Sequence, residues 1–275
     1  MTYEEIIYEV HNHIATITLN RPDKLNAWTF RMEREYRHAM TASQTDERVR
    51  VIVVTGAGRG FCAGADMSLL SGLTDNTLDG AEVHGRPTDS EWPDDVREDF
   101  RKQYTFPPAI RKPIIGAING PAVGLGLVHT LYFDLRFASD RAKFGTAFAQ
   151  RGLIAEHGIS YLLPRLVGLD HALDLLYSAR IIEADEAKAM GLVTQVVPHD
   201  HLMTEVRRYA TQHATMCSPR SLAVMKRQVW DALFQDLDTA TEIANREMFA
   251  SFTCDDFREG VQSFLEKRPP KFTGR

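Results

Sequence analysis

Short runs of apolar residues recur along the chain, some alternating with polar residues and some continuous. Residues 6–10 and 14–19 alternate apolar and polar positions around a polar triplet, which predicts a β-hairpin. Residues 51–54 and 114–118 are continuously apolar, a pattern typical of strands buried on both faces of a sheet. Two further short strands are predicted at residues 135–138 and 193–197.

Helical patterns follow several of these strands. Thr29 is a suitable N-cap for a helix that runs to about Gln44 with an apolar stripe on one side. Residues 183–190 predict a short helix, and residues 239–267 predict a long amphipathic one that ends before Pro269. Strands, glycine-rich turns and helices therefore alternate, which predicts the α/β class.

The composition excludes several classes of protein. A net charge of −5 over 275 residues leaves no basic surface for nucleic acid. Three cysteines without C-x-x-C spacing favour a reducing compartment over a disulfide framework, and the histidines lack the H-E-x-x-H spacing of a zinc site. The acidic N-terminus is unlike a signal peptide, and no apolar run is long enough to span a membrane. We therefore expect a cytoplasmic protein with no metal site and no membrane contact.

Two glycine-rich turns come directly after the continuously apolar strands. Such turns let backbone N–H groups point into a cavity without obstruction by side chains. The first, residues 55–66, does not fit G-x-G-x-x-G because Phe61 takes the place of the third glycine, and it lacks the ending of a P-loop. A nucleotide site is therefore not predicted here. The second turn covers residues 120–126.

Both turns belong to a set of motifs in a fixed order. Residues 61–66, F-C-A-G-A-D, match F-x-A-G-A-D, and residues 19–27, L-N-R-P-D-K-L-N-A, match L-N-R-P-x-x-x-N-A. Together with K-P-I-I-G-A-I-N-G-P-A-V-G-L-G at 112–126, the chain resembles the crotonase (enoyl-CoA hydratase/isomerase) superfamily. Further agreement lies at residues 162–165, 187–193 and 256–260, so that the resemblance covers essentially the whole chain.

The resemblance implies a fold of repeated β-β-α units wound into a spiral, expected over residues 1–200. A C-terminal helical region, residues 201–275, would support assembly into a homotrimer or a dimer of trimers. The implied ligand is an acyl-CoA thioester of the kind found in fatty acid metabolism. No separate cofactor is expected, because coenzyme A enters as part of the substrate.

The resemblance also implies an oxyanion hole for the thioester carbonyl, with the backbone N–H groups of Ala63 and Leu125 as donors. Two such donors suit a thioester, because its carbonyl oxygen gains charge when the neighbouring carbon loses a proton. By the same resemblance, residues 63–67 line the path of coenzyme A. Lys24 and Lys267 are candidates for its phosphates, with Lys267 reaching across to a neighbouring subunit. The expected lining residues are Ala63, Gly64, Ala65, Asp66 and Met67.

The chain departs from the resemblance at the two glutamates that hold water in a hydratase. Val128 and Phe148 stand at these positions of the substrate pocket, and neither side chain can move a proton. Glu156 lies in the segment where relatives that shift a double bond carry their catalytic acid. We expect its apolar neighbours Leu153, Ile154 and Phe148 to raise its pKa, and the nearby helix N-terminus to oppose this.

Three functions stay open on the sequence alone. The first is an isomerase in which Glu156 moves a proton from C2 to C4 of an enoyl-CoA. The second is hydration with Glu156 as the sole carboxylate, and the third is a non-catalytic acyl-CoA binding protein. His129 and His157 keep a β-diketone hydrolase possible, and His157 is placed to orient Glu156 or to act as a second acid. Residues 71–99, including His84, are an acidic segment that is either a solvated loop or a lid.

Overall fold

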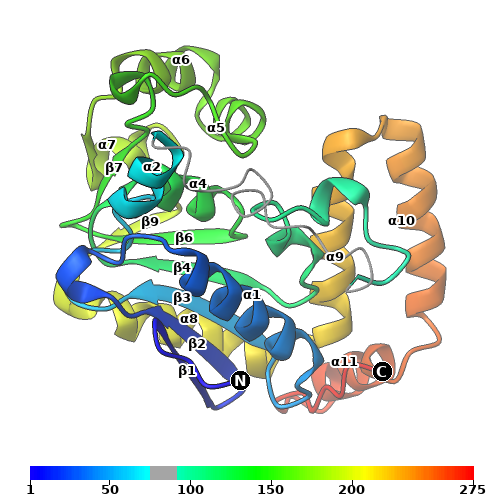
Figure 1. The fold of residues 1–275 in the computed structure, drawn as a ribbon. Coiled ribbons are helices and arrows are strands. Elements are labelled where there is room, and N and C mark those ends of the chain that lie inside the picture. The colour runs from blue at the N-terminus through cyan, green and yellow to red at the C-terminus, as the bar shows by residue number, and fades with distance from the viewer. Residues whose placement is uncertain (75–91) are drawn as a thin grey trace.

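The computed structural model describes residues 1–74 and 92–275 (Figure 1). Six strands form the main sheet in the order β1-β2-β3-β4-β6-β9, in which β1 and β2 are antiparallel and all later neighbours are parallel. A second sheet has the order β5-β7-β8. The main-sheet strands are β1 (Ile6–His11), β2 (Ile14–Leu19), β3 (Val51–Gly56), β4 (Ile114–Ile118), β6 (Leu135–Ser139) and β9 (Gln195–Val197). Those of the second sheet are β5 (Ala122–Val123), β7 (Lys143–Gly145) and β8 (Ile182–Glu183). The predicted hairpin, buried strands and α/β class are confirmed.

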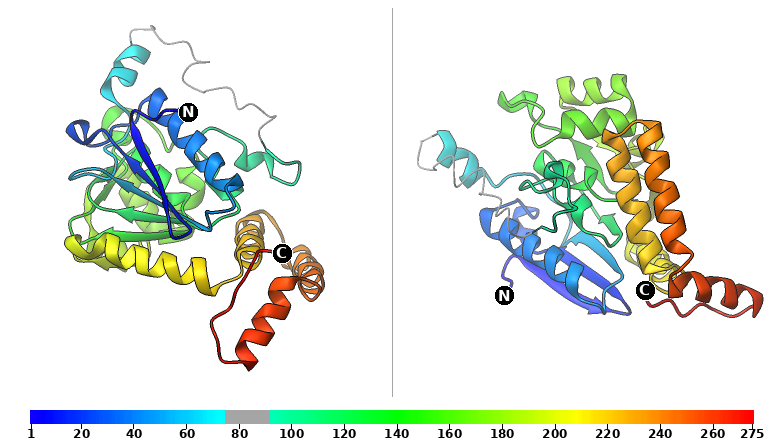
Figure 2. Two further views of the ribbon diagram at one scale, coloured as in Figure 1. Left: turned by 90° about the horizontal axis from the view of Figure 1, so that it is seen from below. Right: turned by 90° about the vertical axis from the view of Figure 1, so that its right-hand side faces the viewer.

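Helices cover both faces of the main sheet. Within β3, Ile52 and Val54 pack into the larger core together with α1, while Val51 and Val53 pack against α8 on the other face. Figures 1 and 2 show α8 lying along the underside of the sheet. Because β3 is buried on both faces, it needs the uninterrupted apolar run seen in the sequence. The helices are α1 (Phe30–Thr45), α2 (Met67–Thr74), α4 (Leu125–Leu131), α5 (Ile159–Val167), α6 (Leu169–Ser178), α7 (Ala184–Ala189), α8 (Leu202–Met216), α9 (Pro219–Asp231), α10 (Leu237–Ser251) and α11 (Asp255–Leu265).

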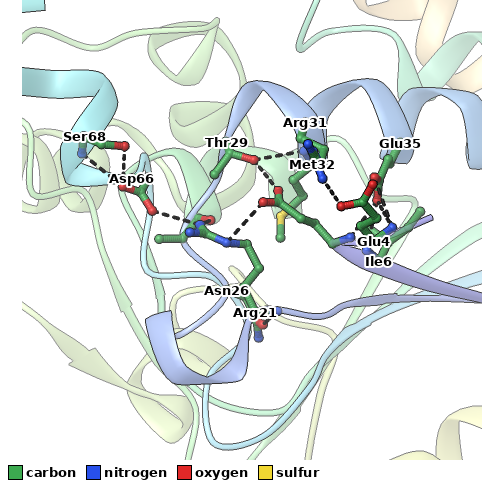
Figure 3. Close-up of polar contacts among 12 residues, drawn as sticks. Glu4, Ile6, Arg21, Asn26, Thr29, Arg31, Met32, Glu35, Asp66 and Ser68 are labelled. Carbon is green, nitrogen blue, oxygen red and sulfur yellow. Dashed lines mark hydrogen bonds and ion pairs between the residues drawn. The ribbon is translucent and has the colours of Figure 1, made fainter. Parts of the chain in front are cut away.

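Helix α1 begins where the sequence predicts. The Thr29 hydroxyl accepts a hydrogen bond from the Met32 N–H at 3.0 Å, which satisfies one of the free donors of the first turn. Further along this helix, the Glu35 carboxylate accepts hydrogen bonds from the N–H groups of Glu4, Glu5 and Ile6 (Figure 3). The start of β1 is thereby fixed to α1.

The C-terminal part differs from the prediction in two ways. First, α8 belongs to the sheet that it covers, so the expected boundary at residue 200 separates this helix from its own core; the helices that leave the sheet begin with α9 (Figure 2). Second, the helix predicted over 239–267 is broken between α10 and α11. Extended backbone at Cys254 interrupts it, and the buried Asp256 carboxylate then accepts hydrogen bonds from the Ser218 hydroxyl and the Thr273 N–H.

The end of this segment is also earlier than predicted. Helix α11 stops at Leu265, and Lys267 adopts a left-handed conformation with φ of 52°, so the helix ends before Pro269 is reached. Ion pairs from Arg268 to Glu259 and Glu266 hold the turn that follows.

The two glycine turns meet at their backbones. A Cβ atom on Gly126 would lie 2.2 Å from the Cys62 carbonyl oxygen, and one on Gly64 would lie 2.9 Å from the Val123 carbonyl oxygen. Both contacts involve main-chain atoms, which cannot rotate away as a flexible side chain would. The first turn of α4 therefore rests directly on the segment that follows β3.

Gly126→Ala should destabilise the protein by about 2 kcal/mol or more, although alanine normally favours a helix, because its methyl group has no room beside Cys62. Urea denaturation measures this change. Gly152→Ala is the matched control, since Gly152 has φ of 69° and no atom within 4 Å of the added methyl. It should cost only the backbone strain, about 1 kcal/mol. Equal effects of the two substitutions would contradict the close backbone contact.

Candidate active site

Two buried asparagines fix the first glycine turn. The Asn26 amide donates to the carbonyl oxygens of Ala57 and Gly60 at 3.0 and 2.9 Å. From the other side, the Asn119 amide donates to Gly60 and Gly58, and its oxygen accepts from the Gly56 N–H at 3.1 Å. Asn26 comes from the L-N-R-P-x-x-x-N-A motif and Asn119 from the second glycine motif. Both motifs therefore hold the same turn.

The structure corrects the expected role of Ala63. Its N–H donates to the Leu25 carbonyl oxygen at 3.0 Å, so it is already used inside the protein. Ala65 follows two residues later, and Trp28 pairs with both of its neighbours. The Trp28 N–H donates to the Gly64 carbonyl, and the Trp28 carbonyl accepts from the Asp66 N–H. In parallel pairing, the N–H of the residue between them faces away from the partner strand. The Ala65 N–H therefore replaces that of Ala63 as the candidate donor.

Leu125 keeps its expected place. It is the first residue of α4, and the first hydrogen bond of that helix runs from the Val128 N–H to Gly124. The N–H groups of a first helical turn have no partner within the helix, and within the described part of the chain the Leu125 N–H has none elsewhere. A Cβ on Gly64 would lie 3.7 Å from the Leu125 nitrogen, so the two turns are adjacent here.

A cavity of about 530 Å³ opens at these turns. Its lining contains most of the residues expected from the sequence: Lys24, Ala63, Gly64, Ala65, Asp66, Met67, Leu125, Phe148 and Glu156. Two expected residues are not part of this lining. Val128 is fully buried in the hydrophobic core, because it faces inward from α4. Lys267 follows α11 and does not line the cavity of its own chain, so its expected contact across a subunit boundary stays a prediction.

Asp66 is held by a chain of polar contacts that reaches back to α1. One of its oxygens accepts from Arg21 at 2.8 Å, and the other accepts from the Ser68 N–H at the start of α2 (Figure 3). Arg21 also donates to the Ala27 carbonyl and lies 3.4 Å from the Glu5 carboxylate. These contacts fix the residue that directly follows Ala65.

Glu156 lies in the turn before α5, at the wall of the cavity. Its side chain is 29% exposed, and this partial burial raises its pKa above the usual range of a glutamate. One expectation about its surroundings is wrong: Ile154 is 73% exposed, so it does not help to bury the carboxylate. Leu153 and Phe148 do line the same cavity as Glu156.

His157 lies beside Glu156, with 3.6 Å between its Nε2 and a carboxylate oxygen. Its backbone has φ of 52°, and the Tyr132 hydroxyl donates to its carbonyl at 2.7 Å. His129 has a different position. It is buried in the core against Trp28, with ring centroids 3.9 Å apart, and burial lowers its pKa to about 3. His129 does not line the cavity and stays neutral.

Several cavity residues escaped the sequence analysis, including Trp28 and Tyr104. Trp28 directly follows the L-N-R-P-x-x-x-N-A motif, so its position next to a known motif was the available signal. Tyr104 lies between two single-turn 3-10 helices, Glu98–Phe100 and Pro107–Ala109, where periodicity gives no signal. The segment 71–99, expected to be either a solvated loop or a lid, lies mostly outside the described residues. The part that is not described, residues 75–91, includes His84.

The sequence matches the model of the family described as enoyl-CoA hydratase/isomerase over residues 9–275. The chain belongs to the enoyl-CoA hydratase/isomerase family. It is 34% identical over 276 residues to a Mycobacterium bovis protein named probable enoyl-CoA hydratase echA8, with all of both chains covered. It is 32% identical over 278 residues to the 1,2-epoxyphenylacetyl-CoA isomerase of Escherichia coli, with 99% of each chain covered.

A solved structure supports the same assignment. The enoyl-CoA hydratase of Bacillus anthracis superposes with a TM-score of 0.87 at 30% identity, covering 99% of this chain and all of that one. The expected crotonase-like α/β fold with C-terminal helices is therefore confirmed, and the protein is an acyl-CoA enzyme of the enoyl-CoA hydratase/isomerase family. In the described part of the chain, helices with both the length and the apolar character needed to span a bilayer are absent.

The Asp66 contacts should be visible in the pH dependence of stability. Burial alone would raise the pKa of Asp66, but hydrogen bonds from Ser68 and Arg21 outweigh it and lower the pKa to about 2. A lowered pKa contributes stability above the unfolded value, near 4, and this contribution is lost as the pH falls toward about 2. Asp66→Asn should therefore be less stable than wild type at pH 7, and the difference should shrink below about pH 4.

Urea denaturation at several pH values measures this difference. Asp23→Asn is the control, because it makes the same chemical change at an exposed aspartate. A constant difference between wild type and Asp66→Asn from pH 7 to pH 2.5 would contradict the proposed hydrogen bonding of Asp66.

Proposed function

We propose that this protein shifts the double bond of an enoyl-CoA from the 3,4 to the 2,3 position, with Glu156 as the group that moves the proton. One observation carries the proposal. Of the two carboxylates among the described residues lining the cavity, Asp66 is bound to Arg21 and Ser68, whereas Glu156 makes no such contact with an arginine or a helix cap. Glu156 is thus the carboxylate available for chemistry.

The reaction needs a base that returns the proton it removes. The Glu156 carboxylate takes a proton from C2 of the 3-enoyl thioester, and the electron pair moves into a dienolate with negative charge on the thioester oxygen. The N–H groups of Ala65 and Leu125 would stabilise that charge, each by roughly 3 kcal/mol. Glu156 then gives the proton to C4, the double bond forms between C2 and C3, and the carbonyl is restored.

Phe148 supports an isomerisation over the usual hydration. It lines the cavity at a position where the family resemblance expects a water-holding glutamate, and an aromatic ring can neither bind nor activate water. Partial burial of Glu156 also helps, because a raised pKa lets the carboxyl group accept a proton and keep it until transfer.

Glu156→Gln tests the proposal directly. Wild type should convert 3-hexenoyl-CoA to 2-hexenoyl-CoA, and the variant should lose about 10²- to 10⁴-fold in rate, because an amide cannot accept the proton. Absorbance of the conjugated thioester follows the reaction. The control is Glu183→Gln, an exposed glutamate paired with Lys143 on the small sheet, which should keep the wild-type rate.

The pH profile provides a second readout of the same prediction. Because the base must be ionised, kcat/KM should fall as the pH drops through the pKa of Glu156, which is raised above the usual range of a glutamate. This acidic limb should vanish from the residual activity of Glu156→Gln. An unchanged rate in the variant, or no conversion by wild type, would rule out the isomerase.

Hydration is the second candidate, and the position of His157 favours it. With 3.6 Å between its Nε2 and a carboxylate oxygen of Glu156, the two groups can both contact one water molecule that lies beside them. Formation of 3-hydroxyacyl-CoA from a 2-enoyl-CoA would establish this reaction. Coenzyme A thioester binding without turnover of either substrate would instead establish a binding protein.

We also propose that the chain assembles as a homotrimer or a dimer of trimers. Large apolar side chains are exposed along α10 and α11, including Phe249 at 65%, Phe264 at 83% and Leu265 at 70%. Exposed apolar surface of this kind marks an interface.

Sedimentation equilibrium should give three or six times the 31.0 kDa of one chain. Phe264→Ser should weaken assembly and Glu242→Ser, an exposed polar position on α10, should not; a monomeric wild type would contradict the proposal.

A further inference from the structure

A second cavity, which we call the aromatic chamber, borders the candidate active site. It has a volume of about 640 Å³ and is lined by six aromatic side chains: Phe100, Tyr104, Tyr132, Tyr161, Trp230 and Phe234. Tyr104 and His157 line both this chamber and the active-site cavity, and their ring centroids are 4.3 Å apart. The two cavities therefore meet at this pair of side chains.

The walls of the aromatic chamber are flat. Tyr161 and Phe234 stack with centroids 5.3 Å apart and an angle of 7° between their planes. Phe100 lies edge-on to Phe234 at 5.8 Å and to Trp230 at 6.0 Å. Arg97 lies 4.4 Å from the Phe234 ring and holds it from outside. Arg165 lies 3.5 Å from the centroid of the Tyr161 ring. The rings thus support one another, and because their faces are covered by each other and by the two guanidinium groups, their edges remain to contact a ligand.

The polar atoms of these aromatic side chains are already used by the protein. The Tyr132 hydroxyl donates to His157, and the Tyr161 hydroxyl donates to the Leu233 carbonyl at 2.7 Å. The Trp230 indole donates to Asp134 at 2.9 Å, and the Tyr104 hydroxyl accepts from Gln103 at 3.1 Å. These bonds fix the rings and leave their carbon edges for a ligand. Asp99, Lys102, Gln103 and Thr105 also line the chamber, but its aromatic side suits an apolar group rather than a polar one.

The proposed chemistry directs the acyl group toward this chamber. Glu156 must contact both C2 and C4, and the side chain beside it at 3.6 Å is His157, which belongs to the shared wall. Carbons beyond C4 therefore lie next to the boundary between the two cavities. A volume of about 640 Å³ exceeds what a single narrow alkyl chain needs and is of the size that holds a ring system.

We propose that the aromatic chamber binds the distal part of the acyl group and that the physiological acyl group carries an apolar ring there. This inference rests on the proposed function, because it needs the thioester held at Ala65 and Leu125. An apolar ring that turns its face to the edges of Phe100, Tyr161 and Phe234 gains edge-to-face contacts beyond the burial of its surface, which a linear chain does not. The chamber thus selects ring-bearing acyl groups over linear ones of equal carbon number.

Calorimetric binding of two saturated thioesters to the full-length protein tests the preference without any turnover. The probes are 6-phenylhexanoyl-CoA and dodecanoyl-CoA, which have the same number of acyl carbons. The phenyl compound should bind about tenfold more tightly, as expected for one or two added aromatic contacts. Equal affinity, or tighter binding of the linear compound, would overturn the proposal.

Phe234→Leu separates ring contacts from simple apolar burial, because leucine keeps the apolar surface and removes the aromatic edge. Phe234 is 37% exposed, so the substitution should be tolerated by the fold. Most of the tenfold preference should disappear, while the affinity for butyryl-CoA, which is too short to reach the chamber, should stay unchanged. Tyr177→Leu, an aromatic position on α6 that is 76% exposed, is the control and should keep the preference. A preference that survives Phe234→Leu would also overturn the proposal.

The failure of this inference and that of the proposed function have different signatures. If 3-hexenoyl-CoA is isomerised but no ring preference is found, the reaction is supported and the chamber assignment is wrong. If 3-hexenoyl-CoA is not converted while the ring preference appears and is lost in Phe234→Leu, the chamber assignment is supported and the isomerase is wrong.

Discussion

The contact between the two glycine turns determines where the candidate active site can form. Because Gly126 lies against the Cys62 carbonyl and Gly64 against that of Val123, the first turn of α4 is held beside the strand-like segment at Ala65. Any side chain at either glycine would separate these backbones. The orientation of both candidate donors follows from this approach: the pairing with Trp28 turns the Ala65 N–H outward, and the start of a helix leaves the Leu125 N–H free. The donors are thus properties of backbone packing, and leucine at position 125 supplies an N–H as well as glycine does.

Neutral amides hold this arrangement from behind. Asn26 and Asn119 together bind three carbonyl groups and one N–H of the first glycine turn, and both side chains are nearly or fully buried. Charged side chains at these positions would carry a large desolvation cost and would act on any charge that develops in the cavity. The ion pair between Arg21 and Asp66 binds the start of α2 to the loop before α1. Both side chains are partly exposed, and contact with solvent reduces the desolvation cost of this pair.

The order of motifs allowed the fold and most cavity residues to be predicted, because glycines, prolines and asparagines at fixed spacing report backbone requirements directly. What could not be predicted depends on tertiary contacts. Whether the Ala63 or the Ala65 N–H faces the cavity depends on pairing with Leu25 and Trp28, which come from a distant segment. The break between α10 and α11 depends on the buried Asp256, whose partners lie on either side of it in the chain. The helical pattern of residues 239–267 gives no sign of the contacts that Asp256 makes with Ser218 and Thr273.

The apolar character of the cavity and the use of a single carboxylate are physically connected. An isomerase must return to C4 the proton that it removed from C2, so the proton has to stay on Glu156 while the dienolate exists. Water near the carboxyl group would exchange that proton and could also protonate the dienolate at the wrong carbon. Phe148, Trp28 and Tyr104 line the same cavity as Glu156, and partial burial of the Glu156 carboxyl group raises its pKa. In the proposed isomerase, phenylalanine at the position of a water-holding glutamate would disfavour hydration and, by the same burial, favour return of the proton.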